Sequence, residues 1–477
     1  MCGIAGQYSL NNEVINQLKN KLIMMSNILE HRGPDGKGIW CSERKNIGFI
    51  HRRLSIIDIS ENGSQPMKGI DNNIITYNGE IYNYLELKNT LSNHWEFKSK
   101  SDTEVILAAY SYYGFDCLKY LRGMFAFALY DYEKDLLFCA RDRFGIKPFY
   151  YFKKNNQFIF ASEPKAILPF LDQIKTNKQA LAEYFTFQFN LGKGTLFDSI
   201  YQLQPGHFIT IKQGNFCIEK YWDIKYEIDK SKNEEQVKSD LNNLLLESIN
   251  LHSRGDVPIG CYVSGGLDSS LIYILNKTNP NSTNHAFHGK FSEHEGHDES
   301  YYASEAAKFI NGNLISRDIT HEDFEKNLYK IIYFLDYPCA GPGSFPQYMV
   351  AELASKYVKV VLGGQGGDEI FGGYARYLIA YLEQCLKAAI DGTYKNGNYI
   401  VTLESVIPNL GLLREYKPMI KNFWKEGLFD SMTKRYYSLI NRASETQDII
   451  NWDELDADSE YTFKEFEKIF DNRNNTS

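Results

Sequence analysis

The sequence of 477 residues lacks a long apolar run and an excess of basic residues. No apolar stretch approaches the roughly 18 residues that suggest a membrane-spanning helix, and the amino terminus has neither the basic nor the apolar region of a secretory signal. The formal net charge of −8 argues against a protein that binds nucleic acid or a membrane surface. The sequence therefore predicts a cytoplasmic protein with no nucleic-acid or membrane partner.

Paired cysteines are also missing. The eight cysteines are scattered along the chain, no two have Cys-x-x-Cys spacing, and no histidine lies at zinc-ligand spacing from a cysteine pair. All of them except Cys2 are interpreted as ordinary thiols of a reducing compartment. Cys2 is set apart by its position next to the first residue.

Residues 1–210 are predicted to form an α+β domain. Short strand-like segments bounded by glycine and Asn-Gly turns alternate here with two helical stretches. The strand-like segments include 74–77 (followed by an expected Asn78-Gly79 turn), 125–130, 149–152 and 158–160, and the helical stretches are 13–29 and 102–113. This pattern favours stacked sheets covered by helices. A polar, charged stretch at 229–236 follows, and the linker is placed at 211–236.

Residues 237–477 are predicted to form an α/β domain. An amphipathic helix over 237–252 leads to an apolar run, 257–263, that suits a buried parallel strand. A glycine-rich turn and a helix follow, and a strand at 358–362 repeats the arrangement. Alternating strands and helices predict an open parallel sheet with ligands at the carboxyl ends of its strands.

The first glycine-rich turn has the features of a phosphate-binding loop. It runs Ser264-Gly265-Gly266-Leu267-Asp268-Ser269-Ser270. Glycines let the backbone approach an anion, the following helix adds its positive dipole end, and Asp268 needs a divalent cation between itself and phosphate. The alternative is an ordinary capped turn. The turn lacks the Gly-Lys-Ser/Thr ending of a Walker A loop and resembles the pyrophosphate loop of the ATP pyrophosphatase superfamily.

The second glycine-rich turn contains six glycines within 363–373. Each glycine costs conformational entropy in an ordered segment, so a loop pressed against a nucleotide explains them better than packing does. Asp368 and Asp268 together would suit a two-carboxylate magnesium site. The alternative for Asp368 is an acidic residue that decorates a helix amino terminus.

Cys2 becomes the amino-terminal residue if Met1 is removed, which its small side chain permits. It then carries a thiol beside a free α-amine, whose unperturbed pKa is about 7.7–8.0. Because the amine can take the thiol proton, one residue supplies both a nucleophile and a general base. The alternative is an incidental cysteine at the second position, and the neighbouring motifs argue against it.

Together these motifs resemble the glutamine-hydrolysing asparagine synthetases, over about residues 1–380 and in the correct order. The motifs are Cys2-Gly3-Ile4-Ala5-Gly6, His31-Arg32-Gly33-Pro34-Asp35, Arg53-Leu54-Ser55-Ile56-Ile57, Asn78-Gly79-Glu80, Ser101-Asp102-Thr103-Glu104, Ala140-Arg141-Asp142-Arg143-Phe144-Gly145, and the two glycine-rich turns. The resemblance implies an amino-terminal-nucleophile domain of stacked antiparallel sheets between helices, followed by an α/β ATP pyrophosphatase domain.

The resemblance also implies a role for each matching residue. Cys2 would attack the glutamine side-chain amide, while Asn78 and the Gly79 N–H would hold the oxyanion. Arg53 would pair with the glutamine α-carboxylate and Asp102 with its α-ammonium; otherwise they are a surface charge and a helix N-cap, and Asp102 can be both. Glu80 and Asn78 would complete the glutamine site.

In the second domain the resemblance implies an ATP site with magnesium on Asp268 and Asp368. The ATP-binding residues would be Val263, Ser264, Gly265, Gly266, Asp268, Ser269, Ser270, Gly289, Gly363 and Gly364. The match at Gly289 is the loosest of these.

Two departures from the family pattern have consequences. Gln365 stands where the family carries a glutamate tied to aspartyl-adenylate chemistry, and a neutral amide cannot act as a general base. The sequence also lacks the family's later Arg-x-Pro-x-Leu-Asp segment and lysine. We therefore expect an incomplete synthetase domain, with one face of its sheet uncovered and an apolar patch exposed. The chain alone should hydrolyse glutamine but synthesise amide poorly or not at all.

The sequence thus predicts glutamine-dependent asparagine synthesis with ATP and Mg²⁺, in which ammonia released at Cys2 reaches an aspartyl-AMP. One alternative is a related enzyme that amidates another carboxylate, such as a sugar acid. Another is a glutaminase whose second domain binds nucleotide without synthetase activity. A homodimer and a separately encoded carboxyl-terminal partner are both compatible with the sequence.

Overall fold

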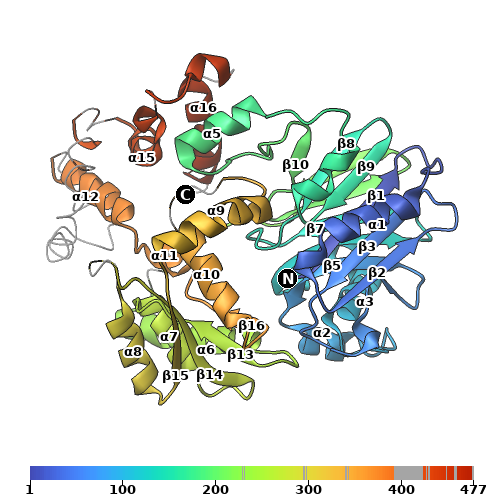
Figure 1. Ribbon diagram of the computed structural model, residues 1–477, viewed down its shortest axis with the longest axis horizontal. Helices are drawn as coiled ribbons and strands as arrows, with labels where there is room; N and C mark the ends of the chain where they lie inside the picture. Colours follow the sequence, from blue (N-terminus) through green and yellow to red (C-terminus); the bar gives the residue numbers. More distant parts are fainter. Residues whose placement is uncertain are drawn as a thin grey trace. The chain divides into compact units, whose positions relative to one another are not determined.

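A computed structural model describes residues 1–390 apart from 228, 230, 294, 295, 297, 339, 340 and 342, together with residues 420, 423–425, 427, 430–446, 448–455 and 459–474. These residues form two compact units (Figure 1). The first unit contains residues 1–177 and 193–363, and the second contains 178–192 and the described residues from 364 onward. This division into compact units does not follow the domain boundaries predicted at residues 210 and 236. Those boundaries stay a prediction.

Two six-stranded antiparallel sheets make up the amino-terminal part of the first unit. In the first sheet the order is β10-β8-β9-β1-β3-β2, with β1 Gly3–Ser9, β2 Gly36–Cys41, β3 Ile47–Arg53, β8 Tyr150–Lys154, β9 Gln157–Ala161 and β10 Ile200–Gln202. In the second the order is β12-β11-β7-β6-β5-β4, with β4 Met67–Lys68, β5 Ile74–Ile81, β6 Gly123–Asp131, β7 Leu136–Arg141, β11 His207–Lys212 and β12 Asn215–Lys220.

The two sheets stack and are covered by helices (Figure 1). Side chains such as Ile4 and Phe49 from one sheet and Ala128 and Cys139 from the other form the core between them. The outer face of the first sheet packs against α1 Leu18–Ile28, and that of the second against α2 Tyr84–Leu91, α3 Asp102–Tyr113 and α4 Cys117–Tyr120. Short 3-10 turns complete this part: η1 Glu30–Arg32, η2 Glu61–Gly63, η3 Gly114–Asp116, η4 Pro164–Ala166 and η5 Leu168–Phe170. The predicted stacked antiparallel sheets between helices are confirmed.

Two local predictions in this part were wrong. The helix expected over 13–29 begins only at Leu18, because Gln17 has a left-handed backbone with φ of 56°. Asn78-Gly79 does not form a turn: both residues continue β5, where they pair with Ala126 and Phe125 of β6. The helix predicted over 102–113, by contrast, has those bounds.

A four-stranded parallel sheet forms the rest of the first unit, as predicted. Its order is β15-β14-β13-β16, with β13 Ile259–Tyr262, β14 Ser282–Lys290, β15 Asn313–Asp318 and β16 Val360–Leu362. The accompanying helices are α6 Glu234–His252, α7 Leu267–Asn276, α8 Ser300–Phe309, α9 His321–Leu335 and α10 Ser344–Ala354. The glycine-rich turn at 264–270 therefore follows a parallel strand and opens a helix.

The expectation that one face of this sheet would be uncovered is wrong. On one face, Cys261 and Ala286 pack against residues of α7 and α8, including Tyr273 and Ala307. On the other, Phe287 packs with residues of α10, among them Met349 and Val350. All three covering helices precede β16 in the chain, so the cover of both faces does not depend on a segment after residue 363.

The second unit is helical among its described residues. It contains α5 Lys178–Phe187, α11 Gly367–Phe371, α12 Ala375–Ile390, α15 Met432–Ile440 and α16 Ser459–Asn474, with 3-10 turns η8 Ala443–Glu445 and η9 Trp452–Leu455. A buried ion pair joins Arg435 Nη2 to Glu383 Oε2 at 2.6 Å. Across the described part of both units, no helix combines the length and apolar character needed to cross a membrane.

Candidate active site

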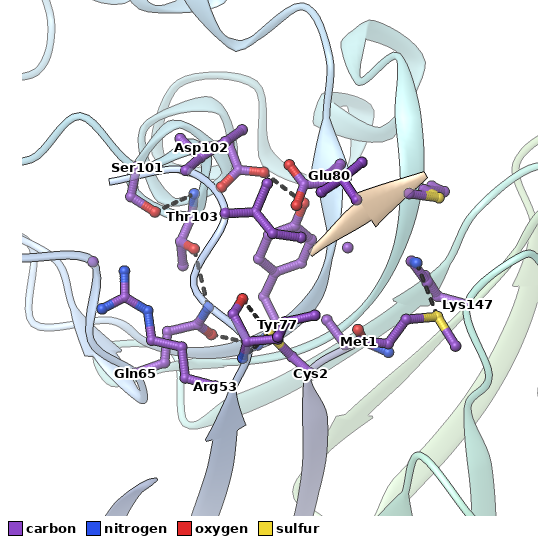
Figure 2. A pocket seen from close by; sticks show the side chains of 18 of the residues that line it. Met1, Cys2, Arg53, Gln65, Tyr77, Glu80, Ser101, Asp102, Thr103 and Lys147 are labelled. Atoms are coloured by element: carbon purple, nitrogen blue, oxygen red, sulfur yellow. Dashed lines mark hydrogen bonds between the residues drawn. The ribbon is translucent and has the colours of Figure 1, made fainter. Parts of the chain in front are cut away.

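One cavity of about 260 Å³ in the first unit brings together all the residues predicted to act on glutamine (Figure 2). These are Cys2, Arg53, Asn78, Gly79, Glu80 and Asp102. They come from the residue before β1, the end of β3, the carboxyl-terminal half of β5 and the first turn of α3. Residues far apart in the sequence therefore meet around a single space that can hold a small molecule.

Cys2 lies at the wall of this cavity, immediately before β1. Its Sγ is 3.3 Å from the Leu54 backbone nitrogen, which donates to it, and 3.6 Å from the Leu54 carbonyl oxygen. Burial raises the pKa of the Cys2 thiol, and burial lowers the pKa of the Met1 amine to about 5. The thiol is therefore protonated near neutral pH and needs a base before it can act as a nucleophile.

Asn78 presents a hydrogen-bond donor to the same space, and Gly79 lines it. The Asn78 side chain is buried, and its Nδ2 has no hydrogen-bond partner among the described residues. An unpaired buried amide is costly, so a ligand oxygen at this position would be stabilised. A Cβ on Gly79 would lie 2.3 Å from the Met124 carbonyl oxygen, so only glycine fits the strand here.

Two carboxylates, Glu80 and Asp102, lie on another wall of the cavity. Asp102 Oδ2 accepts hydrogen bonds from the Tyr77 hydroxyl at 2.7 Å and the Ile81 backbone nitrogen at 2.9 Å. Burial raises the pKa of both carboxyl groups, and in Glu80 the nearby charge of Asp102 adds to the effect. An incoming cationic group would relieve this repulsion, as the α-ammonium of glutamine would. The N-cap of α3 is Ser101, so the reading of Asp102 as the cap is corrected.

Arg53 also borders the cavity. Its guanidinium donates to the carbonyl oxygen of Ser60 at 2.7 Å and to that of Asp58. Both acceptors are neutral carbonyl oxygens, but the Arg53 charge also contributes to lowering the pKa of the Asp35 and Asp58 carboxyl groups, so an anionic ligand group would share this charge with them.

Sequence reasoning missed three contributions to this site. Lys147 lines the cavity although no role followed from the motif that precedes it. Arg32 donates from Nε to the Cys2 carbonyl oxygen at 3.0 Å and from Nη1 to Glu163 at 2.8 Å. The arginine of the His31–Asp35 motif thus anchors the nucleophile. Lys359, Val360 and Val361, around the start of β16, also line the cavity, a tertiary contact for which the sequence carries no signal.

The loop after β13 in the first unit is exposed at Ser264 and Gly266 and offers hydrogen-bond donors for an anion. Gly265 has φ of 106°, and a Cβ there would lie 2.8 Å from the Glu299 carbonyl oxygen. Ser269 Oγ accepts from the Ser264 backbone nitrogen at 3.2 Å and donates to the Gly266 carbonyl oxygen at 3.1 Å. No side chain caps α7, which begins beyond Gly266. Its first-turn amides, with the Ser270 hydroxyl nearby, suit a phosphate group, whereas the Asp268 carboxylate would need a cation between itself and the phosphate.

A second cavity of about 200 Å³ lies beside this loop and includes Val263, Ser264 and Gly289 in its wall. A Cβ on Gly289 would lie 2.7 Å from Ile319 Cδ1, so the glycine keeps β14 close to its neighbours. The buried His288 next to it bonds through Nδ1 to the Val263 carbonyl oxygen at 2.8 Å. Three of the predicted ATP-binding residues are therefore brought together.

The remaining predicted residues of the nucleotide site follow β16. Gly363 is the last residue of the first unit, and Gly364, Gln365 and Asp368 belong to the second. There Gly366 and Gly372, with φ of 98° and 71°, flank the short α11, and Asp368 in its first turn is exposed. Among the described residues no group of three or more histidine, cysteine, aspartate or glutamate side chains could hold a metal ion. The pairing of Asp268 with Asp368 on magnesium stays a prediction.

Comparison with known families also divides the chain into two parts. Residues 1–222 match the family of glutamine amidotransferase domains, and residues 240–468 match the asparagine synthase family. The fold and the two matches define a chain in which a glutamine amidotransferase domain precedes an asparagine synthase domain.

Individual relatives make the assignment narrower. Asparagine synthetase [glutamine-hydrolyzing] 1 of Bacillus subtilis is 39% identical over 79% of this chain and 59% of its own length. A Methanocaldococcus jannaschii protein with the provisional name asparagine synthetase [glutamine-hydrolyzing] 2 is 38% identical over 80% of this chain and 77% of its own. Amidase chry2 of Gibberella zeae is 30% identical over 76% and 56%. The chain belongs to the glutamine-hydrolysing asparagine synthetase family, and it spans about three fifths of the first of these relatives.

Proposed function

We propose that this chain carries out glutamine-dependent amide synthesis, in which glutamine hydrolysed at Cys2 supplies ammonia to an ATP-activated carboxylate, with aspartate as the acceptor. One observation carries the glutamine half: the predicted nucleophile, oxyanion donors and ligand-binding charges line one cavity. The unpaired Asn78 amide supports an oxygen atom as ligand, and the mutual repulsion of the Glu80 and Asp102 carboxylates supports a cationic group beside them.

The proposed glutamine hydrolysis begins after Met1 has been removed. The Cys2 α-amine takes the thiol proton, and the sulfur attacks the side-chain amide carbon. Asn78 Nδ2 and the Gly79 N–H stabilise the oxyanion, and the loss of one such donor typically costs about 10²–10³ in rate. The amine then returns its proton to the leaving ammonia, and water hydrolyses the γ-glutamyl thioester to glutamate.

In the proposed synthetase half, the loop between β13 and α7 binds the phosphates of ATP through its backbone amides and serines. Val263 and Gly289 hold the adenosine beside the second cavity, while Gly363 and Gly364 contribute backbone from the other glycine-rich turn. Mg²⁺ would reduce the repulsion between the phosphates and the Asp268 carboxylate, and the phosphate oxygens would complete its coordination. The ATP and Mg²⁺ requirements, the cytoplasmic location and the homodimer or separate partner all stay proposals.

The acceptor is the least constrained part of the proposal. Gln365 can donate or accept a hydrogen bond but cannot remove a proton from an attacking amine. Because no described residue marks the acceptor, a carboxylate other than aspartate, such as a sugar acid, is the second candidate.

The test is to incubate the purified chain with glutamine, ATP and Mg²⁺, with and without aspartate, and to identify the products by mass. We expect glutamate in both reactions, and AMP, pyrophosphate and asparagine only when aspartate is present, more slowly than glutamate. AMP that forms only with another carboxylate would favour the second candidate. Glutamate without AMP for any acceptor would leave a glutaminase with a merely nucleotide-binding second domain, and no glutamate would refute the proposal.

A further inference from the structure

The loop between β7 and β8 places a buried lysine in the glutamine cavity, and no step of the proposed mechanism uses it. Lys147 is only 5% exposed, yet it lines the cavity beside Cys2 and Glu80 (Figure 2). Its Nζ lies 3.2 Å from Met1 Sδ, and it forms no ion pair with any other residue that the structure describes. A thioether is a weak acceptor, so this contact does little to offset the cost of burying an ammonium group.

Hydrogen bonds within the loop between β7 and β8 fix the backbone of Lys147. Asp142 Oδ2 accepts from the Lys147 backbone nitrogen at 2.9 Å, and Arg141 Nε donates to the Lys147 carbonyl oxygen at 2.8 Å. Asp142 Oδ1 also accepts from the backbone nitrogens of Phe144 and Ile146, at 3.1 and 3.0 Å. Arg141 also donates to the Leu203 carbonyl oxygen, and Asp142 accepts from the Phe125 backbone nitrogen, so the pair ties this loop to β6 and to the residue after β10. One result of these bonds is that the backbone of Lys147 is fixed at the cavity.

The charges around Cys2 show what Lys147 can do there. Lys147 contributes positive charge and Glu80 negative charge at both the Cys2 thiol and the Met1 amine that precedes it, and Arg32 adds positive charge at the amine. Asp102 lies next to Glu80, and Arg53 and Lys359 border the same cavity. Arg32 is already paired with Glu163. Burial lowers the pKa of Lys147, and the charge of Glu80 opposes that shift. Lys147 nevertheless forms no ion pair among the described residues, and removal of Met1 would take away its sulfur contact.

We propose that Lys147 is a positioning residue for the glutamine half-reaction: its ammonium, fixed beside Cys2, favours the free-base form of the Cys2 α-amine and the thiolate form of its sulfur. This inference rests on the proposed function. The proton passes from Cys2 Sγ to the α-amine as the bond from sulfur to the amide carbon forms, and it leaves with ammonia as the carbon–nitrogen bond breaks. A nearby positive charge keeps the amine unprotonated at neutral pH and makes its protonated form a stronger acid toward the leaving group.

The test compares Lys147→Met with Lys147→Arg, and uses Lys37→Met, at an exposed lysine of β2, as the matched control. Two readouts are measured against pH: kcat/KM for glutamine hydrolysis, and the rate at which iodoacetamide alkylates Cys2, followed by the mass of the amino-terminal peptide. Loss of the charge should move the midpoints of both profiles upward by about one pH unit, a roughly tenfold loss on the acid side. Lys147→Arg and Lys37→Met should keep the wild-type midpoints.

Unchanged midpoints in Lys147→Met would overturn the inference, even if kcat/KM fell, because a purely structural role lowers the rate without moving the profile. Midpoints shifted equally in Lys147→Arg would also overturn it, because the charge would then not be responsible. Glu80→Gln gives a check that does not depend on the folding of a Lys147 variant, since removal of the opposing negative charge should move the alkylation midpoint downward. A wild-type chain that hydrolyses no glutamine would refute the proposed function, while the alkylation profile would still decide the role of Lys147.

Discussion

In the glutamine cavity Asp102 and Arg53 are held by partners elsewhere in the first unit, whereas the loop after β13 is bonded mainly to itself. Asp102 is bound by Tyr77 and by the Ile81 backbone, and Arg53 by two carbonyl groups. The serines of the other loop bond to each other and to Gly266, and Asp268 stands half-exposed at the start of α7. Partners within the first unit therefore hold these side chains at the first site. The second site is a loop held mainly by hydrogen bonds among its own residues.

This difference follows from how each site is assembled. The predicted glutamine-binding residues all lie in one compact unit, so the packing of two sheets and three helices sets their positions. The predicted nucleotide-binding residues are divided between two units, with Gly363 at the end of one and Asp368 in the other. Mutations should accordingly have separable effects at the two sites.

The largest expected effect comes from Cys2→Ala. Loss of the nucleophile should reduce glutamine hydrolysis by at least about 10³-fold, because no other described group in the cavity can form the thioester. Amide synthesis supplied with ammonium chloride should remain within about twofold of wild type. The assay measures glutamate and amide separately, with the exposed Cys217→Ala as control. Equal loss of both activities would show that the two sites do not work independently.

Asp268→Asn should affect the other site. Removal of one carboxylate charge should weaken magnesium-ATP binding and lower pyrophosphate–ATP exchange at least about tenfold, a cost typical of a disturbed metal site. Glutamine hydrolysis should be unchanged, as in the exposed control Asp116→Asn. Exchange at the wild-type rate would remove Asp268 from the metal site. A parallel loss of glutamine hydrolysis would mean that the glutamine site and the nucleotide site depend on each other, although they are made of different residues.

Glu163→Gln should reveal how much of the preorganisation around Cys2 is electrostatic. Glu163 is buried, which by itself would raise its pKa, but hydrogen bonds from His31 and Lys165 and the charge of Arg32 hold the pKa at about 2. A lowered carboxyl pKa stabilises the folded chain above the ordinary value of 4.5, and this stabilisation is lost as the pH falls toward 2.

The variant should therefore reduce the free energy of unfolding by roughly 1–3 kcal/mol at neutral pH, since Arg32 and Lys165 lose a charged partner. The deficit should narrow below pH 4.5, the ordinary value. Urea unfolding at several pH values measures it, with the exposed Glu43→Gln as control. A deficit that does not depend on pH would attribute the effect to packing.

The sequence was most informative where a function depends on short, local patterns. The bounds of α3 were predicted from a continuous helical segment although its N-cap is Ser101 and not Asp102, and the residues of the glutamine cavity belong to short motifs that can be recognised in the sequence. Asn78-Gly79 misled because this pair usually marks a turn, whereas pairing with β6 keeps it extended. Lys147 could not be assigned because its burial arises only when the loop folds over Cys2. The cover on both faces of the parallel sheet was missed because it depends on which face each helix joins.

The smallest effect is expected at the contact between the two sheet systems of the first unit. Lys359 Nζ lies 2.7 Å from Asp35 Oδ2, which also accepts from the Ser55 backbone nitrogen next to the Cys2-binding Leu54. The two side chains of the ion pair are 42% and 26% exposed, and pairs of this kind contribute roughly 0–1 kcal/mol. Lys359→Met should therefore raise KM for glutamine by no more than about fivefold, and added salt should reduce the difference from wild type. A double-mutant cycle with Asp35→Asn isolates the pair, with Lys356→Met as the exposed control. A hundredfold or larger increase in KM for glutamine would show that β16, which leads to the second glycine-rich turn, is essential to glutamine binding. The contrast between the glutamine cavity and the loop after β13 would then fail.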